Sequence, residues 1–229
     1  MGKKILVAYA SRYGSTAEIA RVIGEVLRGQ GYDVEVVSVQ EARDVGAYRA
    51  VIIGSSLRVF HLLPEAIRFA RRHRFALAGM PTAYFAAGLM MKDATPENLR
   101  RAEAMLNPLR KIKKPVATAL FPGRLQISGL ERPWRFYFRR LSPIPEGDYR
   151  DWDAVKEWAV ELAGTLRKRC EKLREGDLHG RKSDPHRHKT ASALRTRDPR
   201  AAPALVQTAR LGDAAGVSLD PDLRPGGLR

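Results

Sequence analysis

The sequence predicts an α/β fold, a doubly wound parallel sheet of five strands with helices on both faces. Apolar runs of strand length alternate with segments whose apolar residues recur every three or four positions, from residue 4 to residue 168. The strand-like runs are apolar at nearly every position, which is typical of parallel strands covered on both sides. In such sheets ligands bind at the carboxyl ends of the strands, so we expect a site there.

The strands are predicted at the apolar runs 4–10, 34–39, 49–56, 80–88 and 115–121. A helix is predicted over residues 15–29, because its apolar residues fall on one helical face. Ser15 and Glu18 have the spacing of a capping box at its start, and Gly29 and Gly31 suit its end.

Three further helices follow from start signals. Pro64 suits the first turn of one helix, and Thr95-Pro96 suits the start of another that runs to about Leu109. Asp151 is a candidate cap for the last helix, in which four apolar residues share one face: Trp152, Val155, Ala159 and Leu162. We therefore predict one domain over residues 1–170, with an extended basic and aromatic insert at 122–150. Residues 171–229 are rich in Arg, Asp, Pro, Gly and Ala and are predicted to be a disordered basic tail.

Composition limits the class of protein. The chain has 229 residues, one cysteine and a formal net charge of +16. The single cysteine excludes an internal disulfide and suits a reducing compartment. No apolar run is long enough to cross a bilayer, so we expect a soluble or peripheral protein in the cytoplasm, with the inner face of the cell membrane as an alternative location. The charge would attract polyanions, anionic lipids or acidic substrates, or it would simply keep the surface soluble.

The stretch Ser11-Arg12-Tyr13-Gly14-Ser15-Thr16 links the first strand to the first helix. It lacks the lysine of a Walker loop and the glycine spacing of a dinucleotide loop. Hydroxyl groups, a glycine and a helix N-terminus together favour a bound anion such as a phosphate. An ordinary strand-to-helix turn with Ser15 as its cap explains the same residues.

On this alternating pattern, the stretch resembles the phosphate signature of the flavodoxin family, T-x-T-G-x-T, with Tyr13 in place of the middle hydroxyl residue. The resemblance implies FMN as cofactor, strand order 2-1-3-4-5, and phosphate contacts from residues 11–16. It also implies that two loops, Ser55–His61 and Phe85–Lys92, flank the flavin ring. The cofactor-binding residues implied in these loops are Ser55, Ser56, Leu57, Phe85, Ala86, Ala87, Gly88 and Leu89.

A second resemblance covers about residues 3–168. The element I-I-G-S-S-L-R-V-F-H, the insert and the segment D-Y-R-D-W are similar to those of the flavodoxin-type, quinone-dependent protoporphyrinogen oxidases. In that family Tyr-Gly often stands where this chain has Val59-Phe60. The resemblance implies an FMN-dependent enzyme of haem biosynthesis that oxidises protoporphyrinogen IX and reduces a quinone such as menaquinone. Arg58 and His61 are the implied catalytic residues.

Other interpretations remain open from the sequence. Arg58 suits a surface ion pair as well as a substrate propionate or the flavin phosphate, and His61 suits a loop histidine that faces water. The chain also suits a flavodoxin-type electron carrier, a quinone reductase, or a flavodoxin-like module without enzymatic activity. No metal site is expected, because no cysteine or carboxylate cluster accompanies the tail histidines His179, His186 and His188. The oligomeric state is not predicted.

The insert mixes arginines with aromatic rings, most densely at residues 132–140. Rings at headgroup level and arginines near phosphates suit an anionic membrane surface. The same residues suit a porphyrinogen with its carboxylates, a quinone, or a surface helix held against the sheet by its aromatic side chains. Nucleic-acid binding is not expected, because no nucleic-acid-binding fold accompanies the segment.

Overall fold

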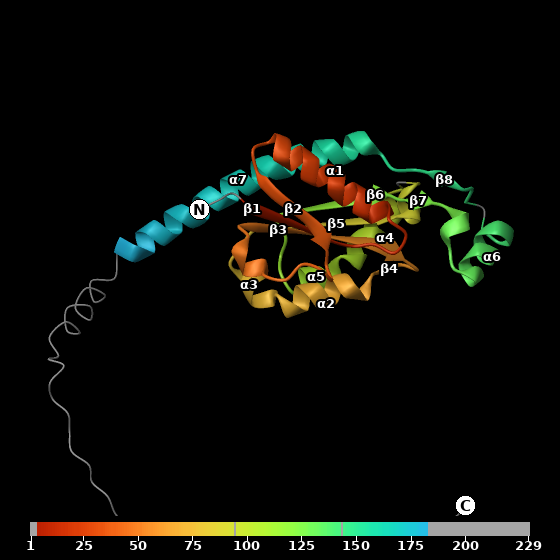
Figure 1. The fold of residues 1–229 in the computed structure, drawn as a ribbon, viewed down its shortest axis with the longest axis horizontal. Coiled ribbons are helices and arrows are strands. Elements are labelled where there is room, and N and C mark those ends of the chain that lie inside the picture. Colours follow the sequence, from red (N-terminus) through yellow and green to blue (C-terminus); the bar gives the residue numbers. More distant parts are fainter. Residues whose placement is uncertain (1–3, 94, 143, 183–229) are drawn as a thin grey trace, which may run out of the picture. The chain divides into compact units, whose positions relative to one another are not determined.

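In a computed structural model, which describes residues 4–93, 95–142 and 144–182, five parallel strands form the central sheet. They are β1 (Lys4–Ala10), β2 (Asp33–Ser38), β3 (Ala50–Arg58), β5 (Thr82–Gly88) and β6 (Ala117–Pro122). Their spatial order is β2-β1-β3-β5-β6, which is 2-1-3-4-5 when the parallel strands are counted along the chain (Figure 1). The predicted fold class and strand order are confirmed. One short strand was missed, β4 (His61–Leu62), which pairs antiparallel with the end of β3.

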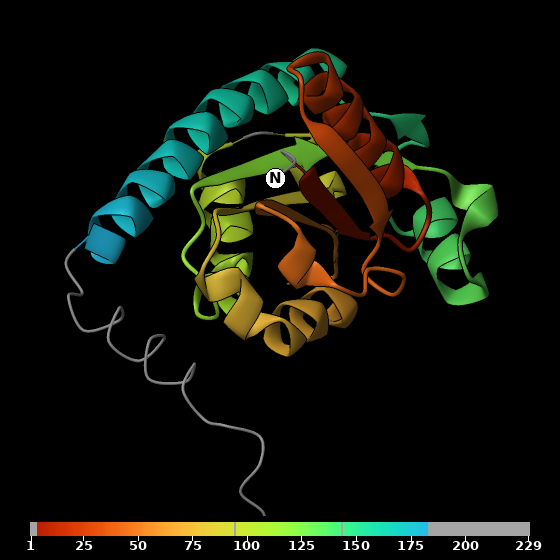
Figure 2. The ribbon, with the colours of Figure 1, turned by 60° about the vertical axis from the view of Figure 1, so that its left-hand side comes forward.

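Helices cover both faces of the sheet (Figures 1 and 2). On one face, α1 (Ser15–Gly29) and α7 (Trp152–Lys182) pack on a core that includes Ile23, Phe85 and Leu162. On the other face, a second core includes Phe69, Leu77 and Leu109. It is covered by α2 (Pro64–Arg72), α3 (Arg74–Ala78) and the junction of α4 (Pro96–Met105) with α5 (Asn107–Arg110). Single-turn 3-10 helices lie at η1 (Val45–Ala47), η2 (Leu89–Met91) and η3 (Ile127–Gly129).

The predicted helix ends are partly confirmed. The carboxylate of Asp151 accepts hydrogen bonds from the backbone N–H groups of Asp153 (3.1 Å) and Ala154 (3.0 Å), so it caps α7 as predicted. The capping box at α1 is wrong. Gly14 is the cap residue with φ +84°, and no side chain caps the helix. Ser15 and Glu18 instead contact the insert, because tertiary partners compete for the same side chains.

The insert at 122–150 is folded. Two short antiparallel strands, β7 (Arg124–Leu125) and β8 (Gly147–Asp148), enclose the helix α6 (Arg132–Arg140). The buried side chains of Leu125, Ile127 and Leu130 form a small separate core, against which Trp134, Phe138, Ile144 and Tyr149 pack. The insert therefore has a core of its own, in which the aromatic residues of α6 pack together with Leu89, the residue that follows β5.

The predicted start of the tail at residue 171 is wrong, because α7 continues to Lys182. Helical hydrogen bonding propagates at little cost once a helix has formed, so a polar sequence that lacks apolar periodicity can still extend one. Residues 183–229, the remainder of the predicted disordered tail, lie outside the described residues.

The turn between β3 and β4 is strained. Arg58 pairs with His61, so Val59 and Phe60 form a two-residue hairpin loop. Both have positive φ, 46° and 59°, as in a type I′ turn. This conformation favours Asn and Gly, and a β-branched residue adopts it rarely.

We expect the double substitution Val59→Asn and Phe60→Gly to raise the free energy of unfolding by about 1–3 kcal/mol, because it relieves strained backbone. Urea unfolding of the apoprotein measures this. The matched control is Val160→Asn in α7, an exposed valine in ordinary helical backbone, which should gain nothing. A double variant that is no more stable than the parent would show that the turn stores no strain.

Candidate functional site

A cleft of about 350 Å³ lies at the carboxyl ends of the parallel strands. Three strand-end segments and the insert form its walls. The strand-end segments contribute Arg12, Tyr13, Ser15, Thr16, Ser56, Leu57, Arg58, Val59, Phe60, Ala87, Gly88, Leu89 and Met90. The cleft therefore brings together residues from all three predicted cofactor loops, as a parallel sheet requires.

One end of the cleft is the turn before α1. The first N–H groups of a helix have no partner within the helix, and its dipole favours an anion there. Ser15 and Thr16 line the cleft, and the hydroxyls of Thr16 and Ser56 lie 2.8 Å apart. In the same turn the hydroxyl of Ser11 is buried without a hydrogen-bond partner among the described residues. Such an unsatisfied donor, together with the helix N-terminus, fits a phosphate group.

Several predicted site residues lie elsewhere. Phe85 is fully buried, and its ring lies where a side chain on Gly54 would be, with a built Cβ only 2.1 Å away. Ala86 is buried in the core on the opposite face of the sheet. Ser55 is also buried, where its hydroxyl accepts a hydrogen bond from the Leu63 N–H at 3.0 Å and donates one to the Ser56 carbonyl. These side chains point into the helix layers, because strand residues alternate between the two faces.

Of the other predicted site residues, His61 and Gly14 do not line the cleft, whereas Gly88 does. His61 is exposed and does not line the cleft, and its Nδ1 lies 2.6 Å from the carbonyl oxygen of Val59. Gly14 shapes the turn through its positive φ without lining the cleft. At Gly88 a Cβ would lie 2.7 Å from the Cβ of Leu57, so this glycine is needed for contact between neighbouring strands.

Two arginines meet one carboxylate at the mouth of the cleft. Glu131, just before α6, pairs with both Arg12 and Arg58 at 3.3 Å. The hydrogen bond from Arg58, and then that from Arg12, holds the pKa of Glu131 below its usual range, so the carboxylate is ionised at neutral pH. The Arg58 guanidinium also lies 5.3 Å from the ring of Trp134 and 6.0 Å from that of Tyr13. Arg58 thus makes a surface ion pair and still borders the cleft.

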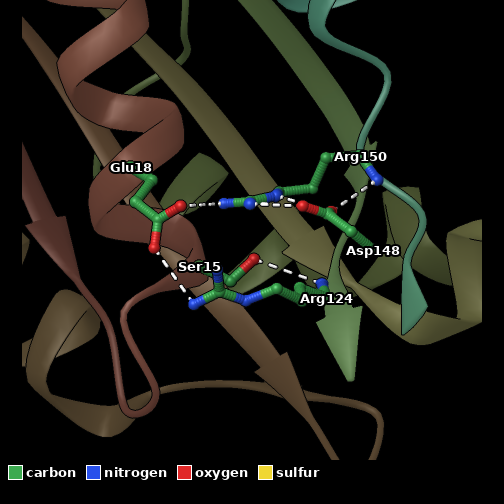
Figure 3. A network of polar contacts seen from close by, with 5 residues as sticks. All are labelled: Ser15, Glu18, Arg124, Asp148 and Arg150. Atoms are coloured by element: carbon green, nitrogen blue, oxygen red, sulfur yellow. Dashed lines mark hydrogen bonds and ion pairs between the residues drawn. The ribbon is translucent and has the colours of Figure 1, made fainter. Parts of the chain in front are cut away.

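A second ionic network joins α1 to the insert (Figure 3). Glu18 pairs with Arg124 at 3.1 Å and with Arg150 at 2.6 Å. The side chain of Arg150 is only 4 % exposed, and its Nε also donates to Asp148 at 2.7 Å. This hydrogen bond is the main reason why the pKa of Asp148 is lowered. The N–H of Arg124 donates to the hydroxyl of Ser15 at 3.2 Å, so the insert contacts the start of α1 directly.

The far wall of the cleft belongs to the insert and was not assigned from the sequence to the cofactor site. It consists of Gly123, Arg124, Leu125, Leu130, Trp134, Tyr137, Phe138, Ser142 and Ile144. The rings of Trp134 and Tyr137 meet edge to face with centroids 6.1 Å apart, and those of Tyr137 and Phe138 lie 5.3 Å apart. The aromatic and basic composition of residues 132–140 indicated function, but only the tertiary structure puts these rings in the same cleft as the start of α1.

Two proteins that share one name are similar to this chain in sequence. The chain is 25 % identical over 173 residues to protoporphyrinogen IX dehydrogenase (quinone) of Escherichia coli strain K12, which covers 70 % of this chain and 94 % of that protein. A protein of the same name from Leishmania major is 24 % identical over 177 residues, covering 70 % of this chain and 74 % of that one.

Similar solved structures include an archaeal flavodoxin, with a TM-score of 0.46 and 18 % identity, covering 72 % of this chain and 99 % of that one. A flavodiiron protein from Giardia intestinalis has a TM-score of 0.49 and 17 % identity, covering 75 % of this chain and 38 % of that one. The family model described as a flavodoxin domain matches residues 6–151, which is more than half of the chain. The chain therefore belongs to the flavodoxin domain family, and this membership indicates FMN as its cofactor.

Proposed function

We propose that this protein is an FMN-dependent oxidoreductase of haem biosynthesis, which oxidises protoporphyrinogen IX to protoporphyrin IX and reduces a quinone such as menaquinone. The observation that carries the proposal is the composition of the cleft, which joins a helix N-terminus suited to phosphate to a wall of aromatic rings bordered by arginines. The names of the Escherichia coli and Leishmania major relatives support the same activity.

The residues of the cleft divide into two groups by role. The N–H groups at the start of α1, with the hydroxyls of Ser15 and Thr16, would hold the phosphate of FMN. FMN, when bound, supplies the chemistry that accepts electrons from the substrate and passes them to the quinone. Arg58 is positioned by Glu131 and is suited to pair with a propionate of the substrate. Trp134 and Tyr137 would pack on the macrocycle and exclude water.

An electron carrier is the main rival within the family. Flavodoxins that act as carriers tend to be acidic, because they dock on basic partners, whereas this chain has a net charge of +16. The charge therefore favours an enzyme whose substrate bears carboxylates. A flavodoxin-like module without enzymatic activity is the second rival, and the presence of bound flavin separates it from both others.

The same proposal includes peripheral contact with an anionic membrane surface through α6. Phe136 and the following Leu141 are 63 % and 66 % exposed, and Arg132, Arg139 and Arg140 are exposed beside them. Tyr137, on the same helix, lines the cleft. None of the described helices has the length and apolar composition needed to cross a bilayer. Docking through α6 would place the cleft where a quinone dissolved in lipid can reach it.

We expect the purified protein to show flavin absorbance and Thr16→Val to weaken FMN binding by about 1–3 kcal/mol, because the substitution keeps the volume and removes a hydroxyl that contacts a charged group. Titration of the apoprotein by flavin fluorescence measures this. Thr165→Val, which removes a hydroxyl from α7 outside the cleft, is the control. Unchanged FMN affinity in Thr16→Val would show that the phosphate lies elsewhere.

We expect the holoprotein to oxidise protoporphyrinogen IX anaerobically with a menaquinone analogue as acceptor. Arg58→Gln should raise the KM for the porphyrinogen about tenfold, because a charge-assisted hydrogen bond to a propionate is lost. Arg68→Gln, an exposed arginine of α2, is the control with the same loss of charge. A rate no greater than that of the flavin-free protein would contradict the proposed dehydrogenase activity and favour the electron carrier.

We expect the protein to float with vesicles that contain phosphatidylglycerol and not with vesicles of neutral phosphatidylcholine. The double variant Arg139→Gln with Arg140→Gln should weaken this binding about tenfold or more, since each arginine near an anionic surface contributes about 1 kcal/mol. The pair Arg100→Gln with Arg101→Gln on α4 is the matched control. Equal losses in both pairs would mean that net charge, and not α6, drives the binding.

A further inference from the structure

We propose that Arg124 is a ligand of the FMN phosphate, and that it makes the cleft select FMN over uncharged riboflavin. This inference rests on the proposed FMN binding and concerns a residue outside the phosphate loop. Arg124 lies at the start of β7, in the insert, far in sequence from the stretch 11–16. With this role, the insert would bind the cofactor as well as the substrate.

Arg124 lies beside the start of α1. Its backbone N–H donates to the hydroxyl of Ser15 at 3.2 Å, and its guanidinium lies 3.1 Å from Glu18, one turn further along α1. The residue lines the cleft together with Ser15 and Thr16, and its side chain is 29 % exposed. An anion held at the N-terminus of α1 would therefore lie next to this guanidinium.

Glu18 places a negative charge close to the turn before α1. One Glu18 carboxylate oxygen would lie only 3.9 Å from a Cβ placed on Gly14, so this carboxylate stands beside the phosphate-type turn and would repel a dianion. Arg150, whose side chain is nearly fully buried, pairs with the other oxygen at 2.6 Å. Arg150 is itself held by Asp148 and lies 4.4 Å from the ring of Trp152.

Arg124 has N–H donors that its pairing with Glu18 does not use. Arg150 already pairs with Glu18, so Arg124 is the second cation on one carboxylate. Only Nη2 of Arg124 bonds to Glu18, and its Nε and Nη1 make no hydrogen bond to another described residue. A guanidinium can hold two anions at once through different N–H groups. Arg124 can therefore bridge Glu18 and a phosphate. In this arrangement Glu18 positions the guanidinium, and the guanidinium offsets the repulsion between the carboxylate and the phosphate.

A purely structural role makes a different prediction. If Arg124 only ties β7 to α1, its loss should weaken FMN and riboflavin alike, because both depend on the same cleft. If Arg124 contacts the phosphate, its loss should weaken FMN alone, because riboflavin lacks that group. The ratio of the two dissociation constants therefore separates the two roles.

The test compares FMN and riboflavin binding to the apoprotein by quenching of flavin fluorescence. We expect Arg124→Gln to raise the Kd for FMN by about tenfold or more while the Kd for riboflavin stays within about twofold. Arg124→Lys, which keeps a charge, should retain most of the wild-type preference for FMN. Arg21→Gln, an exposed arginine on the same helix but outside the cleft, controls for a general loss of charge.

The preference for FMN in the wild-type protein should also fall as salt is raised, because ions screen the pairing of phosphate with a cation at a partly exposed site. An unchanged FMN-to-riboflavin ratio in Arg124→Gln, in protein that binds FMN, would overturn the role of Arg124 alone. If Arg124→Gln fails to fold, the wild-type protein decides the question: a preference for FMN that does not fall as salt is raised would overturn the role of Arg124 equally. Absence of flavin binding in the wild-type protein would instead overturn the proposed function.

Discussion

Because the five main strands run in one direction, all their carboxyl ends open on the same edge of the sheet. The turn before α1, the β3–β4 hairpin and the η2 turn each follow a different strand, yet they meet around one cleft. None of these segments carries much of the hydrophobic core, which lies in the strands and the helices behind them. The sheet thus supplies rigidity, and the strand-end segments are left to carry function.

Two carboxylates then join the insert to this edge. Glu131 holds the arginines of two different strand-end segments, Arg12 and Arg58, at the mouth of the cleft. Glu18 holds Arg124 and Arg150 at the start of α1. These ion pairs act together with a small core that the insert shares with Leu89 of η2. The pairs of Glu131 are exposed and contribute little to stability, whereas the side chain of Arg150 is nearly fully buried. Both networks orient charged groups around the cleft.

The cleft departs locally from what folding stability alone would favour. Val59 and Phe60 occupy left-handed backbone and expose 55 % and 59 % of their surface, although both are apolar. On α6, Phe136 is similarly exposed, and no residue of that helix is buried. Strained backbone and exposed aromatic rings near a cleft are typical of binding surfaces.

The amino-acid sequence by itself determined the sheet and most helix starts, because apolar periodicity and caps such as Asp151 depend on residues close together in the chain. The sequence also indicated the turn before α1, residues 11–16, and the loops that form part of the cleft. Only the tertiary structure decided which side chains in those loops face the cleft, so Phe85 and Ser55 proved to be core residues while Arg124 and Tyr137 line the site. The reason is physical. The direction of a strand residue depends on register and on packing across the sheet, and the pairing of Glu18 with Arg124 and Arg150 joins residues more than a hundred positions apart. Contacts at such separation leave no local pattern in the sequence.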